Sequence, residues 1–190
     1  KKYINTFAAM YGGSVKFDNY FAGVRGHESA LAAALYGDDV PEAVYDSLID
    51  AVHEALPAMG RYIALRKKTL GLEELHMYDL YNPMVEDAGM KFTFEEAKGI
   101  VKKALAPLGE EYGRLLDKAF AEGWIDVYEN KGKTTGAFSC GVYGVHPYVL
   151  LNFTNGLDDV FTLAHELGHA MHSYKSDHAQ AFANHDYSIM

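Results

Sequence analysis

Apolar residues recur three or four positions apart along much of the first 125 residues, which is the spacing of helices with one buried face. The longest such run ends near Leu70 and uses these apolar positions: Val44, Leu48, Val52, Leu56, Met59 and Ile63. Pro57 lies inside this run and is predicted to kink the helix or to divide it in two. An earlier stretch, 27–37, is rich in Ala and Leu and ends on a glycine, which predicts a second helix.

A capping box predicts where the next helix begins. Thr93 is a natural N-cap, and Glu96 follows three residues later, so each side chain can bond the other residue's backbone N–H. Two helices are predicted from this point, over 94–106 and 109–122, with Pro107-Leu108-Gly109 separating them.

The pattern changes from helical to strand-like at Trp124. Aromatic and β-branched residues fill 124–128 and 148–153, which are therefore predicted strands. The Gly-rich run 136–144 lies between them and is interpreted as a hairpin, since it has neither the Lys-Ser/Thr pair nor the following helix of a phosphate-binding loop.

A last long helix is predicted after Asn155-Gly156, with two aspartates in its first turn, where they favour the helix dipole. The predicted fold is therefore mainly α, with a small antiparallel β-sheet just before this helix. We expect one region without an interdomain linker. It would be helical over 1–123, form the sheet over 124–156, and hold the last helix and the segment after it over 157–190.

Composition and charge narrow the class of protein. There are 17 Lys and Arg against 26 Asp and Glu, a formal net charge of −9, and no basic run offers a surface for nucleic acid or an anionic membrane. No apolar run approaches the roughly 18 residues that span a bilayer. The single Cys140 cannot form an intramolecular disulfide, so we expect a soluble cytoplasmic protein. The chain opens without Met and closes without a polar tail, which suggests a fragment of a longer protein.

The last helix contains the motif His165-Glu166-Leu167-Gly168-His169. Histidines at i and i+4 share one helix face, so His165 and His169 are predicted to bind one Zn²⁺. Glu166 would lie beside the metal, where it can take a proton from a zinc-activated water and pass it to the departing amine. The alternative is a helix whose histidines are ordinary surface or core residues. The amphipathic helix and the strand before it favour a zincin-type peptidase instead.

Catalytic zinc normally takes three protein ligands, and the third decides the subclass. The metzincin pattern needs glycine at position 172 and histidine at position 175, but His172 and Lys175 stand there, which excludes that subclass. No Glu follows Glu166. We expect the remaining histidines to lie at the surface or beside the ligands. The groups left near or beyond the motif are His172, Asp177, His178, His185 and Asp186.

Several segments closely resemble the thimet oligopeptidase-like family of zinc metallopeptidases, and within it the oligoendopeptidase F group. Around the motif these segments are 148–153, 157–164 and 165–174, and upstream they are 25–31, 66–68 and 77–81. The resemblance covers essentially the whole chain, as the central part of a longer enzyme. It implies that His165 and His169 bind one zinc per active site, that Glu166 is the catalytic base, and that the third ligand is a Glu just past Met190.

The resemblance further implies an endopeptidase that hydrolyses short oligopeptides in a deep channel, with the remainder of the parent enzyme packed against this chain. Strand 148–153 resembles the edge strand that holds substrate backbone by main-chain hydrogen bonds, with a purely structural strand as the alternative. Cys140 is interpreted as a small apolar residue rather than a nucleophile. The alternative function is a truncated, catalytically incomplete helical fragment that lacks the third zinc ligand.

Overall fold

The computed structural model describes residues 2–85 and 89–188. The chain divides into two compact units, Lys1–Val85 and Glu86–Met190, and the motif lies in the second. None of the helices in the described ranges is long and apolar enough to cross a lipid bilayer.

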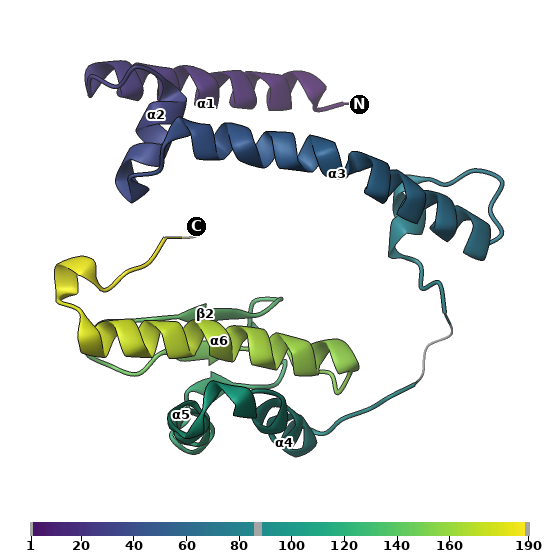
Figure 1. Ribbon diagram of the computed structural model, residues 1–190, viewed down its shortest axis with the longest axis vertical. Coiled ribbons are helices and arrows are strands. Elements are labelled where there is room, and N and C mark those ends of the chain that lie inside the picture. The colour runs from purple at the N-terminus through teal and green to yellow at the C-terminus, as the bar shows by residue number, and fades with distance from the viewer. Residues whose placement is uncertain (1, 86–88, 189–190) are drawn as a thin grey trace. The chain divides into compact units, whose positions relative to one another are not determined.

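The first unit is helical (purple to blue-green in Figure 1). Its elements are α1 (Ile4–Val24), α2 (Ala30–Leu35), the 3₁₀ turn η1 (Tyr36–Asp38), α3 (Glu42–Thr69) and the 3₁₀ turn η2 (Met77–Tyr81). The Ser29 hydroxyl caps α2 by accepting the Ala32 N–H at 2.9 Å. The buried Arg66 guanidinium holds η2 near α3, since it donates to the carbonyl of Asp79 at 3.0 Å and to that of Asn82.

Pro57 does not divide α3, which is one helix of 28 residues with the proline inside it. A proline removes one backbone donor and crowds one carbonyl, whereas the turns on either side keep their own hydrogen bonds. The division considered at this residue is therefore wrong, and the long amphipathic run is a single element.

The second unit contains the other predicted helices and the sheet. Its elements are α4 (Phe94–Ala104), the 3₁₀ turn η3 (Ala106–Leu108), α5 (Glu110–Ala121), β1 (Ile125–Asp126), β2 (Phe138–Cys140), β3 (Tyr148–Leu150), α6 (Leu157–Ala179) and the 3₁₀ turn η4 (Phe182–Asn184). The capping box before α4 is confirmed. The Thr93 hydroxyl accepts the Glu96 N–H at 3.2 Å, and the Glu96 carboxylate accepts the Thr93 N–H at 2.7 Å.

The sheet differs from the predicted one in two ways. Its strand order is β1-β3-β2, and β1 pairs parallel with β3 while β2 pairs antiparallel, so the sheet is mixed rather than antiparallel. The hairpin explains this, because β2 reverses the chain and β3 then returns in the direction of β1. Strand β3 is consequently the central strand and not an edge. Its backbone is bonded on the β1 side by Val149 N–H to Trp124 and Leu151 N–H to Asp126, both at 2.8 Å.

Helix α6 lies between the sheet and the α4–α5 pair (Figure 1). The buried apolar residues come from all of these elements: Ala97, Val101, Leu116, Ala119, Trp124, Val149, Leu151, Phe153, Val160, Leu163, Leu167, Ala170 and Met171. Burying one large aliphatic side chain contributes about 1.5–3 kcal/mol, so the α6 side chains in this core fix the rotation of the helix.

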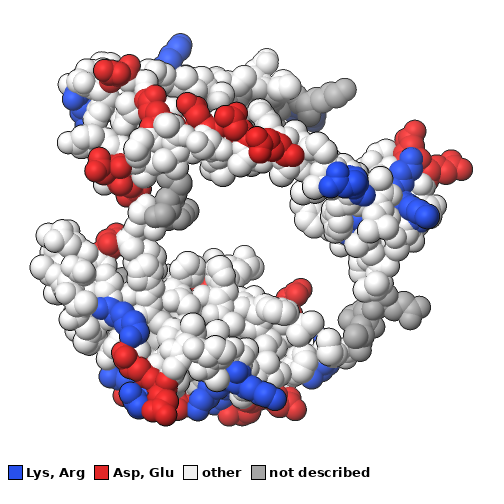
Figure 2. All heavy atoms as spheres, viewed as in Figure 1, with Lys and Arg blue, Asp and Glu red and all other residues white. Residues whose placement is uncertain are grey.

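Charged side chains gather away from this core. Lys102 pairs with Asp117 between α4 and α5, and Lys175 of α6 pairs with Glu111 of α5. Figure 2 shows Lys, Arg, Asp and Glu interspersed along the lower rim, where α4 and α5 lie, while the visible surface over α6 is mostly uncharged.

Candidate metal and catalytic site

Helix α6 begins at Leu157, seven residues after β3 ends, and side-chain hydrogen bonds cap its first turn. The Asp159 carboxylate accepts the backbone N–H groups of Gly156 at 2.7 Å and Thr154 at 3.0 Å, together with the Thr154 hydroxyl at 2.9 Å. An acidic side chain in the first turn satisfies free N–H groups and matches the positive end of the helix dipole. The motif lies two turns later, on a helix whose start and rotation are both fixed.

The two motif histidines point to one place. The Nε2 atoms of His165 and His169 are 3.2 Å apart, and both side chains are exposed. Two nitrogens at about 2.0–2.1 Å from a tetrahedral zinc lie about 3.3 Å apart, so the pair fits two positions of a zinc site. Without a metal, one Nε2–H can donate to the other ring at the same distance. The donor chemistry and the separation therefore suit zinc.

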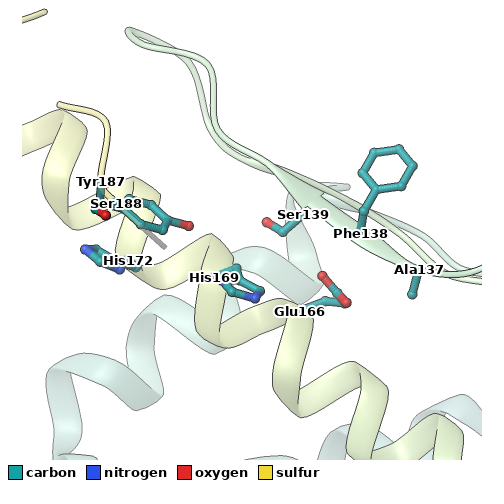
Figure 3. A pocket seen from close by; sticks show the side chains of 8 residues that line it. All are labelled: Ala137, Phe138, Ser139, Glu166, His169, His172, Tyr187 and Ser188. Atoms are coloured by element: carbon teal, nitrogen blue, oxygen red, sulfur yellow. The ribbon is translucent and has the colours of Figure 1, made fainter. Parts of the chain in front are cut away.

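Glu166 has a different environment from the histidines. It is only 8% exposed, and it lines a cavity of about 770 Å³ between α6 and strand β2. Figure 3 shows Glu166 and His169 projecting from α6 toward strand β2. The complete lining is Ala137, Phe138, Ser139, Glu166, His169, His172, Tyr187 and Ser188. A carboxylate one residue from a candidate metal ligand, in a cavity large enough for part of a peptide, is a candidate general base.

The other candidate ligands do not join the pair. Within residues 2–85 and 89–188, no three His, Cys, Asp or Glu side chains come together as a metal site. The His172 ring stacks on Tyr187 with centroids 3.8 Å apart, and Asp177 pairs with His185 at 2.7 Å. The Glu expected past Met190 lies outside the described residues.

The two remaining candidates also have partners of their own. His178 Nδ1 lies 2.7 Å from the Tyr174 carbonyl, and the Asp186 carboxylate accepts the Tyr187 N–H at 2.9 Å. The Asp177–His185 pair and the Ser176 hydroxyl, which donates to the His185 carbonyl, hold His185 near the last turns of α6.

Phe138, Ser139 and Tyr187 line the cavity, although sequence reasoning did not single them out. A signal existed for the first two, because a hairpin strand that pairs with 148–150 must lie near the helix that follows. No local pattern marks Tyr187. Its place depends on how the chain turns back after α6.

Comparisons with known proteins agree with one another. The sequence pattern of peptidase family M3 matches residues 1–190. Oligopeptidase PepF of Bacillus subtilis (strain 168) is 51% identical over 188 residues, which cover 99% of this chain and 28% of that protein. An oligoendopeptidase F homolog of Lactococcus lactis subsp. lactis (strain IL1403) is 43% identical over 189 residues, which cover 100% of this chain and 31% of that protein.

Solved structures give the same picture. A proposed peptidase from Chlamydophila abortus superposes with a TM-score of 0.82 at 40% identity, covering 99% of this chain and 31% of that one. The oligoendopeptidase F of Enterococcus faecium superposes with a TM-score of 0.61 at 36% identity, covering 91% and 25%. The chain thus spans about three tenths of the length of the curated relatives above.

Proposed function

The chain belongs to peptidase family M3, and from this membership we propose that its parent protein is a zinc-dependent metalloendopeptidase that hydrolyses short oligopeptides. The observation that carries the proposal is the convergence of His165 and His169, with Nε2 atoms 3.2 Å apart, beside Glu166 in the cavity. The names of the two curated relatives, an oligopeptidase and an oligoendopeptidase F homolog, support the class of substrate.

Each motif residue has a separate task. His165 and His169 would hold the zinc through Nε2, and a carboxylate from outside the described residues would complete the ligand set, as the resemblance implies for a Glu just past Met190. Bound zinc would supply a Lewis acid that polarises the scissile carbonyl and lowers the pKa of the attacking water. Glu166 would accept the proton from that water and deliver it to the leaving nitrogen, so that the product would depart as a neutral amine.

Strand β2 is the proposed peptide-binding edge, in place of 148–153. Strand β3 is bonded on both sides, whereas β2 ends the sheet and lines the cavity that holds Glu166. An extended peptide added beside β2 would bind through main-chain groups, which every peptide carries whatever its sequence. A broad range of short peptides would therefore be accepted.

The test uses the full-length parent protein and a short internally quenched peptide. Chelation is expected to abolish cleavage and added zinc to restore it. His165→Ala is expected to lose both the metal and about 1,000-fold or more of the activity. His178→Ala, whose ring packs on Tyr174 away from the cavity, is the matched control and should keep both. Full cleavage by the metal-free protein would contradict the proposal.

A second candidate is that these 190 residues alone are a catalytically incomplete helical fragment. It is favoured by the lack of a third ligand among the described residues. The zinc content of the 190-residue chain after dialysis against metal-free buffer tests this second candidate. Essentially no retained zinc is expected of the fragment, whereas one zinc per chain would mean that a further group of this chain completes the site.

A further inference from the structure

Gly141 lies directly after β2 and against helix α6. A Cβ added at Gly141 would be 2.8 Å from both the Cβ and the Oγ of Ser173, well inside the roughly 3.5–4.0 Å at which carbon atoms pack. Among the glycines in the described residues, no other has a neighbour closer than 3.0 Å. The backbone of Gly141 is not in the left-handed region either. The position therefore requires glycine for space and not for backbone freedom.

Ser173 makes this contact rigid. It belongs to α6, lies about one turn beyond His169 and is 8% exposed. Its Cβ is fixed to the helix backbone, so rotating the hydroxyl relieves the contact with Oγ but not the contact with Cβ. Any side chain at 141 must move the end of β2 away from α6, by about 0.7 Å or more to reach an ordinary carbon–carbon separation.

A shift at Gly141 would also move the wall of the cavity. Strand β2 pairs with β3 through Cys140–Tyr148, Ser139–Val149 and Phe138–Leu150. Phe138 and Ser139 line the cavity opposite Glu166 and His169. The glycine contact thus lies at one end of the strand whose Phe138 and Ser139 line the cavity that holds the proposed catalytic groups.

We propose that Gly141 is a positioning residue of the peptidase site: it sets the spacing between β2 and α6, and so the place of a bound peptide carbonyl relative to His165, His169 and Glu166. The inference rests on the proposed function, with β2 as the peptide-binding edge. A misplacement of about 1 Å costs on the order of 100-fold in rate, because the reacting atoms must be held at near-bonding distance.

Gly141→Ala in the full-length parent protein tests the inference. The kcat for peptide cleavage is expected to fall about 10- to 100-fold. KM should change much less, and the zinc content should stay at the parental level. Gly113→Ala in α5 is the control, since a Cβ there meets open space, and parental kcat is expected. Parental kcat in Gly141→Ala would overturn the inference.

A second substitution separates spacing from folding. Ser173→Gly removes both clashing atoms, so Gly141→Ala combined with Ser173→Gly is expected to fold and to recover most of the kcat that Gly141→Ala loses. Ser173→Gly alone provides the reference. A folded double variant whose kcat stays far below that of Ser173→Gly would overturn the inference. This outcome counts even where Gly141→Ala alone fails to fold. An inactive parent would instead overturn the proposed function, and this inference with it.

Discussion

Glu166 is buried in the cavity while His165 and His169 are exposed, although all three lie within little more than one turn of α6. A helix turns about 100° per residue, so neighbouring residues face different surroundings. The result is two accessible nitrogens for a metal and one carboxylate that lines the cavity beside β2. This division of environment suits the separate tasks of binding and proton transfer.

The first prediction concerns the Glu166 carboxylate. Glu166→Gln keeps the shape of the side chain but removes the proton acceptor, so kcat is expected to fall about 10²- to 10⁴-fold. Zinc content should not change, because the ligands are untouched. Peptide cleavage and metal analysis of the full-length protein measure both, with the exposed Glu110→Gln as control. A Gln variant as fast as the parent would rule out the proposed base.

At this scale the sequence predicts what is local. The i, i+4 spacing of His165 and His169 follows from helix geometry, so their convergence could be predicted without coordinates. The contact between Gly141 and Ser173 joins positions 32 residues apart in the sequence. Nothing distinguishes Gly141 from the other glycines until the chain is folded.

Helix starts were predictable because caps are short-range. Thr93 and Glu96 before α4, and Asp159 in the first turn of α6, act within five residues of their partners. The pairing of the strands could not be predicted in the same way, because the order β1-β3-β2 depends on contacts across the 21 residues between β1 and β3. Of the two interpretations of 148–153, the edge strand is therefore wrong and the structural strand remains, whereas the predicted starts of α4 and α6 are confirmed.

The second prediction concerns the capping box. Hydrogen bonds from the Thr93 backbone N–H and then its hydroxyl lower the pKa of Glu96 from its ordinary 4.5. A carboxyl with a lowered folded pKa adds stability above its unfolded pKa and loses it as pH falls through the folded value. Glu96→Gln should therefore lower Tm at pH 7, and the difference should disappear as the pH falls below about 4.5.

Thermal unfolding followed by circular dichroism at several pH values measures this effect. Glu129→Gln, which lies outside any helix, is the control and should leave Tm at pH 7 unchanged. A Tm difference for Glu96→Gln that is equal at pH 7 and at pH 2 would show that charge plays no part in the cap.

The third prediction concerns the packing of α6. Leu167, in the middle of the motif, is fully buried. Leu167→Ala is expected to lower the free energy of unfolding by about 2–5 kcal/mol, because contacts are lost and a cavity is left behind. Urea unfolding measures the loss. Leu157→Ala, at the partly exposed start of the same helix, should cost clearly less, and equal losses would contradict the packing described for α6.

The two units differ in how they are held together. In the described part of the first unit the buried residues are Ala22, Arg66 and Asp79, so it has little apolar core. Long helices with exposed faces depend on tertiary packing for most of their stability. The second unit has a contiguous core that includes Trp124. The expectation of one region from 1 to 190 rests on the absence of a composition change along the chain. It stays a prediction, because each unit is described by itself.

The fourth prediction follows from this difference. The chain has a single tryptophan, Trp124, whose ring stacks on His146 and packs at a tilt against Tyr174 in the second unit. Its fluorescence therefore reports the unfolding of that unit, whereas helical circular dichroism reports both. For the 190-residue chain we expect circular dichroism to begin its loss at lower urea than the fluorescence change. Coincident transitions would show that the two units unfold together.

Helix α6 carries the proposed metal ligands on one side and the core residues Leu163, Leu167, Ala170 and Met171 on the other. Substitutions in this helix are constrained accordingly, because a change that repacks its buried side also moves the proposed catalytic side chains on its other side. Laboratory evolution toward heat resistance would find few acceptable changes along this helix. Tolerated substitutions should lie on the solvent-facing sides of α4 and α5, where a changed side chain affects neither the core packing nor the proposed site.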